Sequence, residues 1–391
     1  MKKISIIILL FIANFTFSQS RTITGTIKDA TTSLPVESVS IGVSNSNLGT
    51  ISNEEGKFRI TLPEKNNVLQ FSHLYYKLES YSIKENETDI EVFIDPKSFV
   101  LEEVVINHKP GKELLIDAVN ASKDKLEKSI LLNTYYREFV KVDGKCTSFA
   151  DGLIDYYVKR KSGASDLEVK QSRAFDMKDE NASERQKAVQ SINLNDVREA
   201  VTNAYSFKGI SELLKNDNYD YAVETKTDSD GNSIEVISIE PKEGLDYELM
   251  KTGSVTYDTK TKLILDIDVR VSPEHKKYAE LHNLLILKMK INDFARKASF
   301  KLDGDKYIMV YSRVKIDVYV KYGKLINNTF ESVCDMTTLD YKEGKFKFDK
   351  NKKYRERSLF DNGNKYTEEF WKKYNVVLLS EAEEKIINSL K

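Results

Sequence analysis

The sequence is poor in the residues on which several common site chemistries depend. Its 391 residues include two cysteines and four histidines. Two thiols cannot build a multi-disulfide framework or a four-thiolate zinc site, and so few histidines limit other metal centres. There is also no phosphate-binding loop, no Gly-rich dinucleotide fingerprint and no nucleophile elbow. We therefore expect no cofactor, no metal site and no catalytic motif.

Proline, glycine and net charge are low as well. Six prolines and 16 glycines exclude long low-complexity linkers. The formal net charge of −1, from 60 basic and 61 acidic residues, argues against a nucleic-acid partner. After the first 20 residues, no stretch approaches the ~18 apolar residues of a transmembrane helix. The remaining composition, 31% charged and 40% hydrophobic, is that of a globular protein, and the length suggests two or three domains.

The first residues, MKKISIIILLFIANFTFSQS, have the pattern of a secretory signal peptide. Two lysines precede an apolar run from Ile4 to Ala13, and Thr16 and Ser18 are small residues ahead of a cleavage point. The sequence predicts a signal peptide over 1–18, with no cysteine after it to carry a lipid. We expect an exported protein that is periplasmic, associated with the outer membrane or secreted.

Export bears on the two cysteines. In an oxidising compartment, Cys146 and Cys334 could form a disulfide across a long loop. They could equally remain two small buried side chains, and the sequence leaves both alternatives open.

Residues 21–96 alternate between apolar and polar positions and carry regular turn signals. This pattern predicts a small β-sandwich, marginally stable alone and helped by docking on the rest of the chain. The expected strands are 22–28, 39–43, 49–52, 57–62, 68–72, 78–83 and 90–94.

The motif order in this region resembles the carboxypeptidase regulatory-like domain, a transthyretin-like antiparallel sandwich common at the N-terminus of exported Bacteroidota proteins. The resemblance rests on GTIKD (25–29), LPV (34–36), GTIS (49–52), EGKF (55–58) and LQFS (69–72). It departs at Glu54-Glu55, where the domain usually has an Asp or Asn before the glycine, and at HLYY (73–76), where it usually has a Gly-Tyr pair. The resemblance implies a fold and no peptidase activity, because no histidine is followed by Glu at zinc-peptidase spacing.

The expected linker, 97–110, contains LEEVVI at 101–106. This segment resembles the one that joins the same sandwich to the plug of outer-membrane TonB-dependent receptors, where it can act as an energy-coupling box. The rest of the chain is too short for a plug and a barrel of about 22 strands. We interpret the segment as a linker or a covering strand.

Residues 111–391 are predicted to form a larger β-rich domain with N- and C-terminal helices. Apolar residues at helical spacing predict an amphipathic helix over 111–130, and long consecutive hairpins predict one broad antiparallel sheet. The fold class is therefore mainly β, with a curved sheet or half-open barrel covered by that helix. The expected strands are 134–142, 145–160, 221–227, 233–240, 253–258, 263–271, 284–302, 306–322 and 325–341, with helices at 194–205, 210–214 and 381–390 and an otherwise irregular 162–218.

Two further resemblances fall in this domain. GSVTYD (253–258) followed by LILDID (263–268) is similar to a strand–turn–strand of the periplasmic lipoprotein-carrier superfamily, which implies a curved, half-open barrel. The chain as a whole resembles uncharacterised exported Bacteroidota proteins that combine the sandwich with YYRE (135–138) and a terminal FW pair (370–371). That second resemblance implies no known activity.

Two groups of acidic residues are candidate sites. Asp228, Asp230 and Asn232 suggest a calcium loop, but Gly and Glu do not follow at EF-hand spacing, so we predict a hairpin turn. Asp266 and Asp268 share one face of a strand, as a carboxylate pair or as part of a solvent face.

Aromatic residues are plentiful, with 21 Tyr and 18 Phe. They can serve as cross-strand and core packing, or they can line a cavity in which Tyr offers an apolar ring and a polar tip. Under the second interpretation the candidate ligand-binding residues are Tyr135, Phe139, Tyr156, Tyr311 and Tyr319.

Three hypotheses follow. The leading one is a non-enzymatic exported binding protein of the cell envelope, whose curved sheet holds an apolar or amphipathic, lipid-like ligand; it requires that the concave face is not filled by the protein's own side chains. The alternative is a structural protein that contacts other envelope proteins. The third is a hydrolase with a site assembled from His275, Glu280, His282, Asp266 and Asp268.

Overall fold

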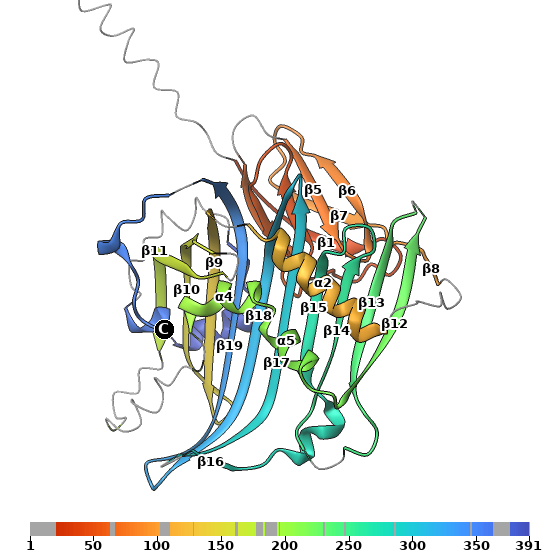
Figure 1. The fold of residues 1–391 in the computed structure, drawn as a ribbon. Coiled ribbons are helices and arrows are strands. Elements are labelled where there is room, and N and C mark those ends of the chain that lie inside the picture. Colours follow the sequence, from red (N-terminus) through yellow and green to blue (C-terminus); the bar gives the residue numbers. More distant parts are fainter. Residues whose placement is uncertain are drawn as a thin grey trace, which may run out of the picture.

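The computed structural model describes residues 21–62, 67–101, 110–127, 129–160, 163–176, 183, 194, 196–229, 231–245, 248–284, 287–344, 346–362 and 376–390. These residues form a small β-sandwich and a large curved sheet (Figure 1). The mainly β prediction is confirmed. The expected signal peptide, most of the 101–106 segment and the 370–371 pair lie outside the described residues.

The sandwich contains the seven expected strands, close to their expected ends. Its core is built from residues that alternate along these strands, such as Ile23, Ile27, Phe58 and Phe71, all almost fully buried. The two sheets have the orders β4-β1-β7 and β3-β2-β5-β6. The strands are β1 Arg21–Asp29, β2 Ser40–Val43, β3 Gly49–Ile51, β4 Lys57–Leu62, β5 Val68–His73, β6 Tyr76–Ser82 and β7 Asp89–Ile94.

One detail of the sandwich corrects the expectation of wholly antiparallel pairing. Strand β7 pairs with β1 in parallel, with Ile27 opposite Val92. Strand β6, which precedes β7 in the chain, belongs to the other sheet. The chain therefore crosses between the two sheets before β7, and β7 runs beside β1 in the same direction. A two-residue turn could only have joined them antiparallel.

Gly56 shows why the EGKF motif needs its glycine. It has a φ of +69°, a region that residues with a Cβ rarely adopt. An added Cβ would also lie 2.4 Å from the carbonyl oxygen of Ile27. The turn into β4 can therefore pack against β1 only with glycine at this position.

Within the described residues, the large sheet has twelve strands, and all its neighbouring pairs are antiparallel. Its order is β11-β10-β9-β19-β18-β17-β15-β14-β13-β12-β8, with β16 paired to β17 off this path, and β11 and β8 do not pair to close it. The strands are β8 Phe99–Leu101, β9 Ile130–Val142, β10 Lys145–Val158, β11 Ser165–Asp176, β12 Tyr219–Asp228, β13 Ser233–Pro241, β14 Lys251–Asp258, β15 Ile264–Val271, β16 His282–Leu284, β17 Leu287–Asp303, β18 Lys306–Tyr322 and β19 Ile326–Glu343.

Two strands fall where none was expected. β11 lies inside the region expected to be irregular, and β8 lies inside the expected linker, where it pairs with β12. β11 is an edge strand whose Asp166 and Glu168 form ion pairs with lysines rather than packing. The apolar alternation that identifies strands is therefore short in β11, while β8 has only three residues.

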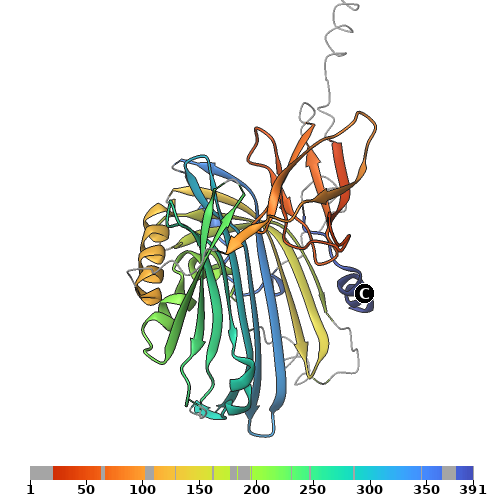
Figure 2. The same cartoon turned by 90° about the vertical axis from the view of Figure 1, so that its right-hand side faces the viewer.

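Helices cover one face of the large sheet and enclose the main core. Figure 2 shows them on the side of the sheet away from the sandwich. Their buried side chains pack on those of β9, β10, β13, β15 and β18, among others, so the face beneath them is filled by the protein itself. The helices are α2 Gly111–Lys125, α4 Ala200–Tyr205 and α5 Lys208–Leu214, after the short 3-10 turn η1 Val197–Glu199.

Helix α2 is the covering helix predicted from the sequence, but it ends at Lys125, before the expected residue 130. Leu115, Ala118 and Val119 face the sheet, and Ser122 Oγ accepts a hydrogen bond of 2.9 Å from the backbone N–H of Ile264. The chain then turns directly into β9 at Ile130, which sets the end of the helix.

The opposite face of the sheet meets the sandwich and the C-terminal segment. Ile51 of the sandwich packs in one cluster with Tyr135, Leu153, Leu339 and Val377. The remaining short elements are the 3-10 turns η2 Pro273–Tyr278, η3 Lys350–Lys352 and η4 Leu359–Asp361 and the C-terminal helix α7 Glu381–Leu390, which is present as expected.

Helix α7 links the two units. Its first backbone N–H, of Glu381, donates to Glu55 Oε1 at 2.7 Å, and the Glu381 carboxylate lies 3.1 Å from Lys57 Nζ. Glu383 Oε2 accepts from the backbone N–H of Ser380 in a capping box. Because of these contacts, the helix holds the sandwich and the sheet together. None of the helices in the described part of the chain is both long and apolar enough to cross a membrane.

Candidate ligand cleft

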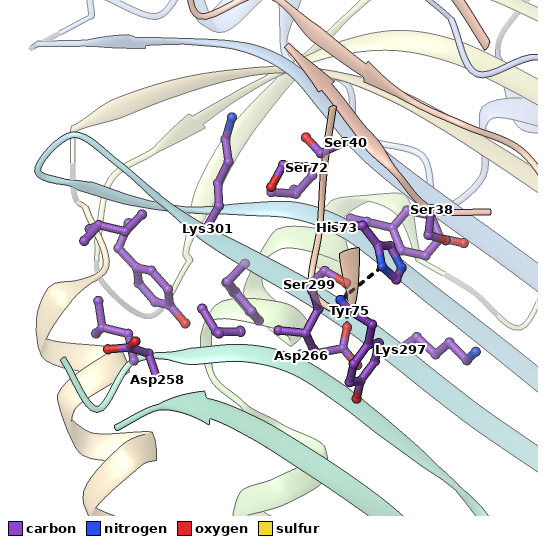
Figure 3. Close-up of a pocket in the computed structure, with 18 of the residues that line it drawn as sticks. Ser38, Ser40, Ser72, His73, Tyr75, Asp258, Asp266, Lys297, Ser299 and Lys301 are labelled. Carbon is purple, nitrogen blue, oxygen red and sulfur yellow. Dashed lines mark hydrogen bonds between the residues drawn. The ribbon is translucent and has the colours of Figure 1, made fainter. Parts of the chain in front are cut away.

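A cleft of about 550 Å³ lies between the sandwich and strands β15, β17 and β18 of the large sheet. Figure 3 shows side chains from both units pointing into it. This volume is in the range of sites for small organic ligands. The polar residues that line it include Ser38, Ser40, Ser72, His73, Lys97, Asp258, Asp266, Asp268, Lys297, Ser299 and Lys301.

The sheet side of the cleft is set by the register of β15 and β17. Asp266 lies opposite Ser299 and Asp268 opposite Lys297, so all four side chains share the face toward the sandwich. Ser299 Oγ donates a hydrogen bond of 2.7 Å to Asp266 Oδ1, and Lys297 Nζ is 3.6 Å from Asp268 Oδ2.

Asp266 is the perturbed acid of this cleft. Burial raises its pKa to about 6, and the negative charge of Asp268 adds to the rise, while the Ser299 hydrogen bond opposes it. The Asp266 carboxyl therefore exchanges its proton near neutral pH. The shift arises because burial removes water from around the carboxylate and so favours its neutral form.

The sandwich side carries a neutral histidine. The backbone N–H of Tyr75 donates to His73 Nδ1 at 3.2 Å, which leaves the ring proton on Nε2. Burial and the nearby charge of Lys97 lower the pKa of His73 to about 4. His73 is therefore an uncharged hydrogen-bond donor at neutral pH. Ser40 and Ser72 lie opposite each other on β2 and β5 at the same wall.

The floor of the cleft is partly apolar. Leu263, Leu265, Phe300, Leu302 and Val310 contribute to it. An apolar floor beneath hydroxyl, imidazole and carboxyl groups matches a ligand with an apolar body and a polar head.

The five aromatic residues singled out from the sequence do not gather in one place. Tyr311 lines the cleft, and Tyr135, Phe139 and Tyr319 lie on the same face of the sheet but outside it. Tyr135 is buried and donates at 2.7 Å to Asp151 Oδ2, and Tyr156 donates at 2.7 Å to the Val197 carbonyl within the core under the helices.

The YYRE segment (135–138) of β9 holds two C-terminal segments of the chain against the large sheet. Tyr135 and Arg137 point toward the sandwich, and Tyr136 and Glu138 point toward the helices, as alternation along β9 requires. Arg137 Nε lies 2.6 Å from Asp335 Oδ1 and its NH1 2.9 Å from Glu383 Oε2 of α7.

The other half of the segment anchors the chain on the helix side. Glu138 accepts from Ser358 Oγ and, at 3.1 Å, from Tyr136 Oη. Ser358 precedes η4, so two neighbouring residues of β9, Arg137 and Glu138, hold C-terminal segments on the two opposite faces of the sheet.

The acidic turn is a hairpin, as predicted. Asp228 ends β12 and uses its carboxylate to accept from the backbone N–H of Asn232 at 2.9 Å. Gly231, at φ +78°, completes the turn into β13. Asp230 lies outside the described residues.

The residues of the hydrolase hypothesis are not brought together. Asp266 and Asp268 line the cleft, whereas His275 is buried in η2 after the far end of β15, with Nδ1 2.9 Å from Ser272 Oγ. His282 is exposed on β16, at the tip of the molecule. Within the described ranges, no three His, Cys, Asp or Glu side chains are grouped closely enough to hold a metal ion.

The two cysteines are free in this structure, so the alternative in which they pair is not the one observed. Cys146 on β10 and Cys334 on β19 are separated by the whole of β9, because that strand pairs with both. Burial raises the pKa of the Cys334 thiol to about 12.

The sandwich wall of the cleft was not predicted from the sequence. His73 and Tyr75 belong to HLYY (73–76), whose departure from the domain's usual pattern was the available signal, whereas Ser72 ends the matching LQFS motif. Their approach to Asp266 depends on how the sandwich docks, and no local pattern encodes that.

Part of the chain matches a known domain family. Residues 23–106 match the model of the CarboxypepD_reg-like domain. The sandwich is a carboxypeptidase regulatory-like domain. The TonB-dependent receptor P3 of Formosa agariphila is 26% identical over 106 residues, which are 27% of this chain and 10% of the receptor. The chain thus spans about a tenth of the length of that relative.

Solved structures resemble the chain only distantly. A lipovitellin structure described for its lipid–protein interactions has a TM-score of 0.24 at 11% identity, covering 57% of this chain and 26% of that one. A DUF1329 family protein from Desulfovibrio piger has 0.21 at 14% identity (60% and 95%). A LolA superfamily protein from Nitrosomonas europaea has 0.20 at 10% identity (61% and 96%). At these TM-scores the likenesses carry no argument about function.

Proposed function

We propose that this chain is an exported, non-enzymatic binding protein of the cell envelope that holds a small amphipathic ligand in the cleft between sandwich and sheet. The observation that carries the proposal is the cleft itself, about 550 Å³ with an apolar floor and a polar wall. The sequence suggested a ligand held on the concave face of the curved sheet. The cleft lies elsewhere, because the sheet face beneath the helices is filled by the protein's own side chains.

The lining indicates the ligand's chemistry. Leu265, Phe300 and Val310 offer an apolar surface to a chain or ring. His73 Nε2, Ser72 and Ser299 offer hydrogen-bonding groups near one another in Figure 3. The ligand we expect has an apolar body and a polar head that both donates and accepts hydrogen bonds.

The non-enzymatic part of the proposal is supported by how the polar groups are used. The Ser299 hydroxyl donates a hydrogen bond to Asp266 Oδ1, and His73 Nδ1 accepts one from the backbone N–H of Tyr75. A nucleophile needs a base that is in turn oriented by a third group. These contacts instead hold the side chains as fixed donors and acceptors. Envelope location is supported by the signal-peptide pattern and by the receptor relative.

The experiment is the recovery of a co-purified ligand. Residues 19–391 are expressed with export to a periplasm, purified without detergent and extracted with organic solvent, and the extract is quantified by mass spectrometry. Ser72→Trp fills the cleft, whereas Ser80→Trp, on the exposed part of neighbouring β6, leaves it open. The proposal expects one amphipathic species that is lost in Ser72→Trp and retained in Ser80→Trp; equal recovery from both, or from neither, contradicts it.

A second candidate is a structural partner of envelope proteins. It is favoured by the match to a TonB-dependent receptor and by the exposure of Leu34, Leu78 and Phe93 on the sandwich. The test is affinity capture from an envelope extract, with Leu78→Ser and Phe93→Ser as the variant. Capture of a specific outer-membrane protein that this variant loses supports it, and capture of none argues against it.

A further inference from the structure

The end of the large sheet opposite the sandwich is an exposed tip made of β16 and the adjoining ends of β17, β18 and β19 (Figures 1 and 2). We define the tip as the described residues 281–284, 287–291 and 318–328. It carries large apolar side chains in contact with solvent: Leu281, Leu284, Leu287, Ile291 and Leu325 are 43%, 48%, 37%, 39% and 50% exposed. Apolar groups gathered at one end of a molecule usually mark an interaction surface.

The strand register sorts the tip into two chemically different faces. Leu284 lies opposite Leu287, and Met289 opposite Val320, so these side chains share one face. Because side chains alternate along a strand, the intervening lysines point to the other face. That second face carries Lys288, Lys290 and Lys321.

The lysine face is electrostatically unfavourable on its own. Lys288 lies directly opposite Lys321, and like charges in that position repel. In the part of the chain that the structure describes, neither lysine takes part in an ion pair. The tip as defined contains four lysines and no acidic residue, and Glu280 directly precedes it in the sequence. An anionic partner would relieve this repulsion.

We infer that the tip docks on an anionic lipid bilayer. A bilayer interface suits both faces at once, because the apolar face can enter the boundary between headgroups and acyl chains while lysine side chains extend to the phosphates. A protein partner would need an anionic surface for one face of the tip and a separate apolar surface for the other, whereas a bilayer interface combines both in one layer. The inference is independent of the cleft, which lies at the other end of the sheet.

The test is vesicle co-sedimentation of residues 19–391, using phosphatidylcholine vesicles and phosphatidylcholine–phosphatidylglycerol vesicles at about 7:3. We expect binding to the anionic vesicles only, weakened when salt rises from about 50 to 500 mM because the attraction is screened. Each lysine near an anionic surface contributes roughly a fivefold factor in affinity. Lys288→Gln with Lys321→Gln should therefore weaken binding by about tenfold or more.

The variants separate docking from misfolding. Lys288→Gln with Lys321→Gln removes a repulsive pair, so the fold should be unharmed. Its charge-matched control is Lys208→Gln with Lys215→Gln, at the first residue and the C-cap of α5. Leu284→Ser with Leu287→Ser should weaken binding as well, against the control Leu34→Ser with Leu78→Ser on the sandwich. Circular dichroism checks folding. No binding to anionic vesicles, equal binding to both vesicle types, or equal loss in tip and control variants overturns the inference.

Discussion

Replacing Arg137 by Met should destabilise the protein by about 3 kcal/mol. Arg137 lies on β9 with only 7% of its side chain exposed, between Asp335, 2% exposed, and Glu383 of α7, 19% exposed. Burial alone would lower the pKa of Arg137, and the two carboxylates more than offset this and raise it. Met fills the aliphatic volume but leaves Asp335 as a buried anion without its nearest cation.

The magnitude follows from the environment of the two acids. Removing one member of a buried ion pair costs about 3–5 kcal/mol. Glu383 can rehydrate at the surface, and Arg313 NH1 remains 3.8 Å from Asp335 Oδ2, so the lower end of that range applies. The assay is the free energy of unfolding from urea titrations followed by circular dichroism.

Two controls make the result specific. Arg313→Met removes a more exposed cation, 43% of whose side chain meets solvent, and should cost less than about 1 kcal/mol. Arg137→Met with Asp335→Leu should be more stable than Arg137→Met alone, because the orphaned charge is gone. A loss below about 1 kcal/mol for Arg137→Met, or an additive double variant, would refute the role assigned to this pair.

Three further predictions concern other sites. The pKa of Asp266 is about 6 in the folded protein, against an ordinary value of 3.8, so the folded chain binds this proton more tightly and the free energy of unfolding falls as pH rises from about 4 to 6. In urea unfolding, Asp266→Asn should therefore be about 1–2 kcal/mol more stable than the parent at pH 7, allowing for partial exposure, and equal to it below pH 4. A stability difference that does not change between pH 4 and pH 7 contradicts the raised pKa. Thiol titration of non-reduced protein should count two thiols in denaturant, with Cys334 unreactive before unfolding; no reactive thiol in denaturant would show that it pairs with Cys146. Gly253→Ala should cost about 2 kcal/mol in thermal unfolding, because its Cβ would lie 2.3 Å from the carbonyl oxygen of Asp268, and a loss under ~0.5 kcal/mol would exclude that clash.

Much of the fold could be predicted from local pattern. The spacing of apolar residues predicts the sandwich strands, the helix that begins at residue 111 and the long hairpins, because strands have a period of two and helices a period of about 3.6 residues. Asp143-Gly144 predicted the β9–β10 turn, and both residues have positive φ there. Strand β11 was not predicted, because several of its side chains are charged and form ion pairs, so its sequence has little apolar alternation.

The site was harder because it depends on contacts between distant segments. Asp266 and Asp268 lie on one face of a strand, as the sequence predicts, but only the docking of the sandwich places that face in a cleft. Tyr135 and Tyr156 are candidate ligand contacts because they are aromatic and lie on predicted hairpins, but in the structure both are buried and donate hydrogen bonds inside the protein. Aromatic content cannot distinguish a cavity wall from a core when the tertiary arrangement is unknown.

The native mass spectrum of the unmodified chain, exported and purified without detergent, tests the central claim most directly. The proposed binding function predicts a reproducible additional mass of one small amphipathic molecule, released on addition of organic solvent. A spectrum containing only the mass of the polypeptide, repeated across preparations, would contradict a ligand held in the cleft.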